Sequence, residues 1–192
     1  MKFVESFGRH MIEAFLEEDG LNFLRDRDGD FIVQFGYDDE IEGHPRFLLA
    51  VAGDDNEQYC LRGDTLSRVS REDWDRSARL CNEWNALYKM PKVYFEVDDP
   101  NKSTTGRIVC EQWLDLEAGV HQELINQFTS TFFSACFGFW RWLERQHAIS
   151  ALADVKEDDD ETDANPESDN LALEDQRDPE DDDLEEDRIE DV

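Results

Sequence analysis

The chain has 192 residues and a formal net charge of −30, with 49 acidic and 19 basic residues. Binding to nucleic acid or to an anionic membrane surface is disfavoured, because both need a cluster of Lys or Arg and the sequence has none. The longest apolar run is shorter than the roughly 20 residues of a membrane span, so we expect no span.

The acidic residues are unevenly distributed. Residues 151–192 hold 21 acidic residues, three basic residues and no aromatic residue. So little apolar surface cannot offset the entropy of ordering the segment. We therefore predict one folded domain over residues 1–149 and a disordered acidic tail over 150–192. The tail is interpreted either as a solubilising extension or as a charged segment that attracts basic surfaces.

The first elements are a helix and a hairpin. Apolar residues recur at helical spacing over residues 4–20, and Gly20 is a suitable stop. Residues 21–37 alternate around Asp28-Gly29, which is a strong hairpin signal. Residues 46–52 predict a short buried strand. Residues 58–63 are either another strand or a continuation of it.

The second half repeats this mixture of helix and strand. A helix is predicted from Ser70 to the Met90-Pro91 pair, followed by strands over 92–99 and 106–116 and a last helix over 121–146. Helices stand between groups of strands rather than after each strand. This order, α-β-β-β-α-β-β-α, predicts an α+β fold with an antiparallel five-stranded sheet and three helices.

The last helix contains a dense aromatic run over residues 132–143. On a helical wheel Phe133, Phe137 and Trp140 share one side, nearly opposite Phe139 and Trp142. A helix that is apolar on both sides needs two burial partners. The second side either packs within the same fold, for example on the first helix, or forms a dimer interface or client groove.

We select Phe133, Phe137 and Trp140 as the candidate protein-binding or dimer surface. Burial of all three within one chain would remove this assignment.

Sequence motifs for chemistry are absent. No nucleophile elbow, phosphate-binding loop or zinc-protease motif occurs. The histidines have no His or Cys partner close in sequence, and the cysteines are more than twenty residues apart: His10, His44, His121, His147, Cys60, Cys81, Cys110 and Cys136. We expect free thiols in a reducing cytoplasm, no catalytic residue, no cofactor and no metal.

Four motifs in residues 74–143 resemble the YbjN family of bacterial proteins, described as sensory transduction regulators. They are Cys81-Asn82-Glu83-Trp84-Asn85, the strand start at Pro91-Lys92-Val93-Tyr94, the Leu114–Val120 junction LDLEAGV, and Phe139-Trp140-Arg141-Trp142-Leu143. The resemblance extends over residues 3–145 in element order, with 38–64 and the tail outside it. Its motifs are structural rather than catalytic.

The resemblance implies a fold similar to that of type III secretion chaperones, which are usually homodimers without a cofactor. It implies roles for two kinds of residue. Asn82 and Asn85 would hydrogen-bond backbone near the end of the second helix, and Gly119 would supply a conformation that a side chain hinders.

Our leading hypothesis is a cytoplasmic, non-enzymatic, chaperone-like or regulatory protein that binds a partner polypeptide through an apolar surface, as a homodimer. A second hypothesis is a dedicated assembly or regulatory factor for one protein complex, with the acidic tail engaging a basic surface. An enzyme of unrecognised type is the third. It would need a deep polar pocket with convergent titratable groups.

Overall fold

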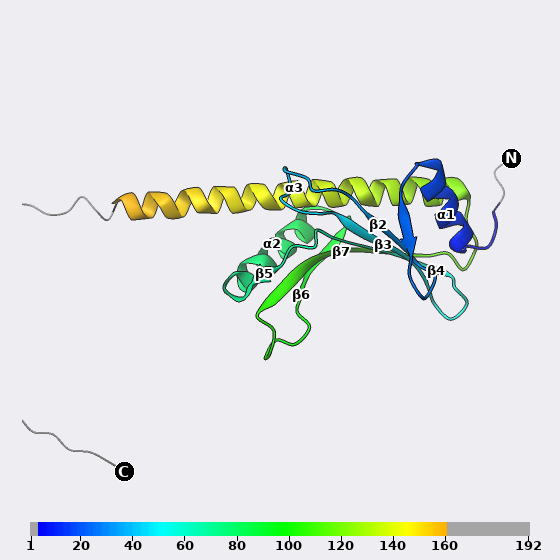
Figure 1. Cartoon of the computed structure of the whole chain (residues 1–192), viewed down its shortest axis with the longest axis horizontal. Helices are drawn as coiled ribbons and strands as arrows, with labels where there is room; N and C mark the ends of the chain where they lie inside the picture. Colours follow the sequence, from blue (N-terminus) through cyan, green and yellow to red (C-terminus); the bar gives the residue numbers. More distant parts are fainter. Residues whose placement is uncertain (1–3, 161–192) are drawn as a thin grey trace, which may run out of the picture. The chain divides into compact units, whose positions relative to one another are not determined.

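The computed structural model describes the backbone of residues 4–160 and the side chains of residues 4–147. The helices are α1 (Arg9–Glu18), α2 (Trp74–Leu87) and α3 (Gln122–Asp160), and a short 3-10 helix (Arg71–Asp73) leads into α2 (Figure 1). The strands are β1 (Phe23–Arg25), β2 (Phe31–Gln34), β3 (Arg46–Ala52), β4 (Gln58–Asp64), β5 (Val69–Ser70), β6 (Lys92–Glu96) and β7 (Thr105–Asp115).

The strands form one antiparallel sheet in the order β1-β2-β3-β4-β7-β5, with β6 also paired to β7. The predicted α+β class and antiparallel sheet are confirmed, but the sheet has seven strands instead of five. Residues 58–64 form the separate strand β4, because a turn at Gly53, with φ +90°, reverses the chain after β3. The two-residue strand β5 pairs with the start of β7 and was not predicted.

Helix α1 begins later than predicted. Residues 4–8 are not helical, since Gly8 is extended at φ −175° and Glu5 pairs with Val120 through two backbone hydrogen bonds of 3.0 and 2.8 Å. Gly20 follows the helix end at φ +64°, as its role as a stop predicts. The Asp28-Gly29 hairpin is confirmed, with Gly29 at φ +84° between β1 and β2.

The aromatic run of α3 packs inside this single chain. Phe133 stacks on Phe47 of β3 with ring centroids 4.1 Å apart, and Trp140 lies 5.6 Å from the same ring. Phe133 is 8% exposed and Trp140 is 3% exposed, while Phe137 is half-buried next to Phe35 of the β2–β3 connection. The expected intermolecular surface is therefore core at Phe133 and Trp140, because α1 and strand β3 supply their burial partners.

The opposite side of α3 packs on α2. Trp84 of α2 lies 5.1 Å from Phe139 and 5.6 Å from Trp142, measured between ring centroids. Both apolar sides of α3 thus pack within one fold. Of the alternatives for its second side, the structure shows packing within the same chain.

The sequence motifs predict backbone hydrogen bonds for Asn82 and Asn85 and a special backbone conformation for Gly119. The Asn85 amide accepts from Val93 N–H at 3.0 Å and donates to Val93 C=O at 2.7 Å. Asn82 is exposed and makes no such bond. Gly119 has φ +84°, and an added Cβ would lie 2.9 Å from the Glu5 carbonyl oxygen, so its predicted conformational role is confirmed.

The backbone of α3 is helical through Asp160, so helix continues past the predicted start of the tail at residue 150. Residues 161–192 lie outside the described residues. Disorder of that segment stays a prediction.

Candidate functional site: the open face of the sheet

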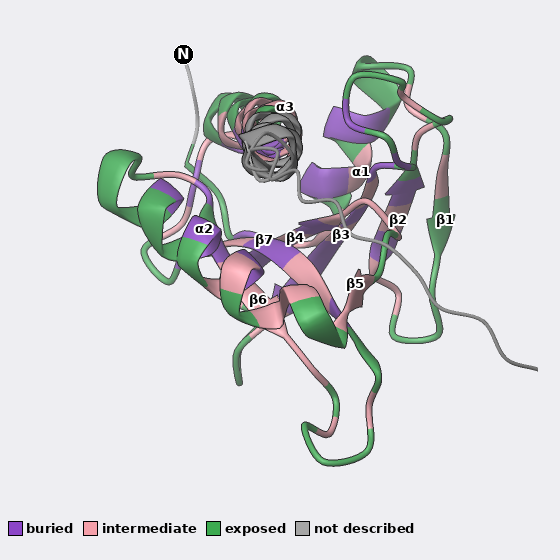
Figure 2. Cartoon of the chain, turned by 90° about the vertical axis from the view of Figure 1, so that its left-hand side faces the viewer, coloured by how far each residue is buried: buried purple, intermediate pink, exposed green. Residues whose placement is uncertain are grey.

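Alternate residues of each strand point away from the helices and form what we call the open face. Tyr59 and Leu61 of β4 are fully buried against the helical side, whereas Arg62 between Leu61 and Gly63 points to the other side. Figure 2 shows the three helices on one side of the sheet. Within the described residues, no helix packs on the open face.

One row of residues crosses the open face from edge to edge, as the strand register defines it. Read from β1 to β6, the row is Leu24, Ile32, Leu48, Arg62, Glu111 and Lys92. Its first half, over β1 to β3, is apolar. Its second half, over β4, β7 and β6, is charged, so the open face is itself amphipathic.

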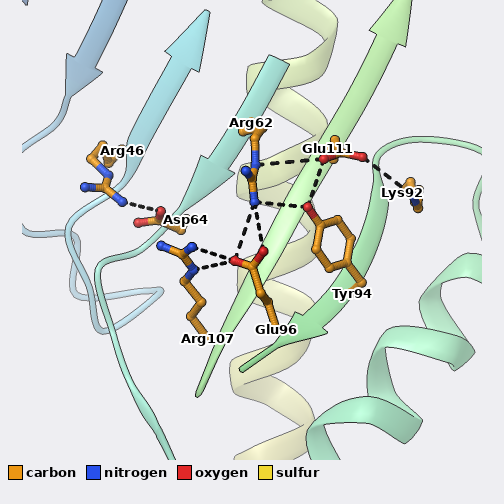
Figure 3. A network of polar contacts seen from close by, with 8 residues as sticks. All are labelled: Arg46, Arg62, Asp64, Lys92, Tyr94, Glu96, Arg107 and Glu111. Carbon is orange, nitrogen blue, oxygen red and sulfur yellow. Dashed lines mark hydrogen bonds and ion pairs between the residues drawn. The ribbon is translucent and has the colours of Figure 1, made fainter. Parts of the chain in front are cut away.

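The charged half is held together by a hydrogen-bonded network centred on Glu111 (Figure 3). Arg62 Nη2 donates to Tyr94 Oη at 3.1 Å, and Tyr94 Oη donates to Glu111 Oε2 at 2.8 Å. Lys92 Nζ lies 3.5 Å from Glu111 Oε1. The groups come from three strands, so the network fixes side chains across the sheet as well as pairing charges.

Three further ion pairs lie on the same face. Arg107 Nε donates to Glu96 Oε2 at 2.6 Å, and Arg62 Nη2 lies 3.4 Å from Glu96 Oε1. Arg46 Nη2 donates to Asp64 Oδ2 at 2.6 Å. Four cations, Arg46, Arg62, Lys92 and Arg107, thus face the three carboxylates of Asp64, Glu96 and Glu111.

These contacts shift the pKa values of the network. Burial raises the pKa of Glu111, but the hydrogen bonds from Tyr94 and Trp113 and the charges of Lys92 and Arg62 outweigh it, so that pKa is lowered. Burial and the hydrogen bond to Glu111 raise the pKa of Tyr94 to about 12. Burial lowers the pKa of Arg62, but Tyr94 and the neighbouring carboxylates raise it by more, so the pKa of Arg62 is raised overall. Each group is therefore held in its ordinary charge state at neutral pH.

A hollow of about 240 Å³ lies where the two halves of the open face meet. Arg46, Arg62 and Arg107 surround it, and Asp26 and Asp64 are the acidic residues of its lining. Its apolar lining on the open face comes from Ile32, Leu48 and Val109. Each guanidinium carries five N–H donors. Because Arg46 uses only Nη2 in the network, its other donors are free for a ligand group.

Two large apolar side chains are exposed on the open face. Trp113 of β7, opposite Cys60 of β4, is 46% exposed, and Leu24 of β1 is 72% exposed. Trp and Arg are the residue types most enriched at the energetic centres of protein interfaces. The open face offers both on one rigid sheet.

A second cavity of about 360 Å³ lies between α3 and the segments before β3 and β5. Burial and the nearby charge of Glu42 raise the pKa of Glu144 there. Burial and Arg76 lower the pKa of His147, despite opposing effects of Asp73 and Glu42. Within residues 4–147, no group of three or more His, Cys, Asp or Glu side chains is arranged to hold a metal ion.

All four cysteines are buried and free of disulfide bonds, as expected. Burial raises the pKa of Cys81 to about 12 and that of Cys136 well above its ordinary value. Such thiols stay protonated and act as small apolar groups. None of the described helices has the length and apolar composition that a membrane span needs.

The open-face residues were not selected from the sequence, although a signal was present. Polar or charged residues recur with period two in Arg62-Gly63-Asp64 and in Lys92, Tyr94 and Glu96. This alternation marks one side of each strand. Which strands bring those sides together depends on register, which the sequence pattern alone does not give.

The fold has a solved counterpart, "Crystal structure of YbjN, a putative transcription regulator from E. coli", with a TM-score of 0.57 and 12% sequence identity. The alignment covers 76% of this chain and 97% of that chain. No curated protein matches this chain. Residues 9–145 match the YbjN family, described as "Putative bacterial sensory transduction regulator". The chain belongs to the YbjN family.

Proposed function

We propose that this protein is a cytoplasmic, non-enzymatic regulator that holds a partner polypeptide against the open face, as a homodimer. The observation that carries the proposal is the contrast between the two sides of the sheet. The helical side uses Phe133 and Trp140 for its own core, while the open face leaves Trp113 and Leu24 exposed and carries a fixed charge network.

A polypeptide fits this surface better than a small substrate. The cross-strand row passes from apolar to charged side chains over six strands, which at about 4.8 Å between strands is about 24 Å long. An extended or helical segment can match such a length with apolar and charged groups in order. The hollow of about 240 Å³ then accepts one side chain of that segment.

The electrostatics of the network favour binding over acid–base catalysis. A catalytic acid or base works best with a pKa near the operating pH. Here the pKa of Tyr94 is raised to about 12 and that of Glu111 is lowered, so both move away from neutrality. Their partners are side chains of the same network.

The solved neighbour is described as a transcription regulator, and we propose regulation through protein contacts for this chain. Direct DNA binding would need a basic face. The open-face network instead balances most of its cations with carboxylates, in a chain of net charge −30.

The second candidate function is a dedicated assembly factor whose acidic tail engages a basic surface. Its support is the net charge of −18 over residues 151–192, with 21 acidic and three basic residues. Removal of residues 161–192 separates the candidates. Open-face binding predicts that partner binding survives, and tail binding predicts a large, salt-sensitive loss.

The main test is site-specific photo-cross-linking in cells of the native host. A benzophenone amino acid replaces Trp113 on the open face or, as a control, Leu124 of α3, which is 45% exposed on the helical side. The proposal expects an adduct with a distinct protein from position 113 that is absent from position 124. Equal adducts from both positions, or none from 113, would overturn it.

A further inference from the structure

We infer that the cavity of about 360 Å³ between α3 and the segments before β3 and β5 binds a small organic amine, whose ammonium group lies between the carboxylates of Glu42 and Glu144. This cavity is on the helical side of the sheet. Ile108 of β7 lines it, whereas the neighbouring Arg107 and Val109 line the hollow of the open face. A ligand in the cavity therefore does not occupy the proposed partner site.

The polar lining of the cavity is acidic, and part of it has no partner. The carboxylates of Glu42, Asp73 and Glu144 face one guanidinium, that of Arg68, so with His147 neutral the lining has a net charge of −2. Within residues 4–147, the carboxylates of Glu42 and Glu144 make no hydrogen bond or ion pair. The Nε2 atom of His147 is buried and also has no hydrogen-bond partner there. Buried polar atoms without a partner are rare in native folds, and a bound ligand supplies one.

An ammonium group fits these three unpartnered groups. Burial and the charge of Glu42 raise the pKa of Glu144, as expected for two neighbouring carboxylates of which one is poorly solvated. A cation between them offsets this repulsion. Burial also lowers the pKa of His147, so its ring is neutral at neutral pH and accepts a hydrogen bond at Nε2 when Nδ1 carries the proton. The three N–H donors of a primary ammonium group suffice for both carboxylates and this nitrogen.

An apolar floor receives the body of the ligand. Trp140, Leu143, Glu144 and His147 recur at helical spacing, so they lie on one side of α3. Trp140 and Leu143 are buried, and Ile41, which is 2% exposed, adds to the floor from the segment before β3. Small-molecule sites are cavities of this size with a mostly apolar lining and a few placed polar groups. The arrangement therefore selects an amine with an apolar body over a bare inorganic cation.

Contacts within the chain hold the rim of the cavity in place. The His44 N–H donates to the Thr65 carbonyl at 3.0 Å, which joins the segment before β3 to the segment before β5. Glu40 pairs with Arg141, which joins the first of these segments to α3. Glu42 has φ +46°, in the left-handed region that residues other than glycine rarely adopt, and such conformations cluster at ligand sites. The rim is thus a fixed feature of the fold.

Titration of the purified full-length chain with phenethylamine, followed by NMR of the tryptophan indole N–H groups, tests the site. Phenethyl alcohol and hydrocinnamate, which carry no charge and a negative charge on a similar body, are the matched ligands. We expect phenethylamine to shift the Trp140 signal, to leave that of Trp113 on the open face unchanged, and to bind about tenfold or more tightly than either matched ligand. Glu144→Gln should weaken amine binding about tenfold, and the exposed Glu83→Gln on α2 should change it by less than about twofold.

Two results would overturn the site: equal affinity for phenethylamine and phenethyl alcohol, or a shift of Trp113 as large as that of Trp140. Glu42→Gln is the second variant, because Glu42 is exposed on its loop and its replacement leaves the core intact. It should weaken amine binding several-fold. Unchanged affinity in both Glu42→Gln and Glu144→Gln would mean that the amine is held only by general attraction to an acidic chain, and it would also overturn the site.

Discussion

The ring of Phe133 on α3 stacks on the ring of Phe47 on β3, with centroids 4.1 Å apart and planes inclined by 29°. This contact joins residues 86 positions apart in the sequence and anchors the aromatic run to the sheet. It explains why so acidic a chain keeps so many aromatic residues: they form the core of its folded part.

Truncation of this contact should cost stability. We expect Phe133→Ala to lower the free energy of unfolding by about 3–5 kcal/mol, because it leaves a cavity against Phe47. Denaturant titration followed by tryptophan fluorescence measures the change. The control Leu124→Ala, on the same helix but 45% exposed, should cost less than about 1 kcal/mol. Similar costs for both variants would contradict the assignment of Phe133 to the core.

The buried hydroxyl pair of Tyr59 and Thr129 predicts an asymmetric result. Their oxygens are 2.8 Å apart, and Thr129 Oγ1 also donates to the Ile125 carbonyl at 2.8 Å. Thr129→Val leaves the Tyr59 hydroxyl buried without a partner and should cost about 1–3 kcal/mol of stability. Tyr59→Phe leaves Thr129 its bond to Ile125 and should cost less. Equal losses of unfolding free energy for the two variants, measured by denaturant titration, would contradict a special cost of leaving the Tyr59 hydroxyl without a partner.

The lowered pKa of Glu111 predicts a dependence of stability on pH. The folded pKa is below the reference value of 4.5, so the unfolded chain binds more protons in that range. The stabilisation is present above about pH 4.5 and is lost as the pH falls through the folded pKa. Glu111→Gln should be less stable than wild type at pH 7, with the difference narrowing at acidic pH.

Thermal unfolding between pH 7 and pH 3 measures this difference. Glu83→Gln is the matched control, because Glu83 is exposed on α2. A constant difference between Glu111→Gln and wild type across that range would contradict the account of the network.

Much of the fold was visible in the sequence, because local signals agreed with the final structure. Asp28-Gly29 gave the hairpin, and helical spacing gave all three helices. The errors have long-range causes. The helical wheel of α3 shows two apolar sides but not that Phe47 covers one and Trp84 the other. The sequence leaves residues 58–63 as a strand or a continuation, because their pairing to β7 is non-local.

The candidate site was harder to predict than the fold. In the most conspicuous apolar feature Phe133 and Trp140 are core and Phe137 is half-buried, whereas the exposed Trp113 lies in a strand of otherwise ordinary composition. Charges dominate the open face, and their pairing depends on strand register: Arg62 lies opposite Glu111, and Glu96 opposite Arg107. A sequence pattern places each residue on a side of its strand but does not pair the strands.

The proposed homodimer predicts a mass of twice the 22.5 kDa of one chain. Static light scattering measures it. Because each copy carries a net charge of −30, added salt should screen their repulsion and shift the equilibrium toward the dimer. Phe137→Ser, at the half-buried member of the aromatic set, should leave the mass unchanged. A mass of one chain at every salt concentration would rule out the dimer.

The most direct test of the central claim is the affinity of the partner captured at Trp113, measured by titration against purified wild type and two variants. Trp113→Ser removes the exposed aromatic residue of the open face, and Leu87→Ser removes a 69% exposed leucine at the end of α2. Open-face binding predicts that Trp113→Ser weakens binding by about tenfold or more, while Leu87→Ser changes it by less than about twofold. Unchanged affinity for Trp113→Ser, or an equal loss for Leu87→Ser, would contradict a partner site on the open face.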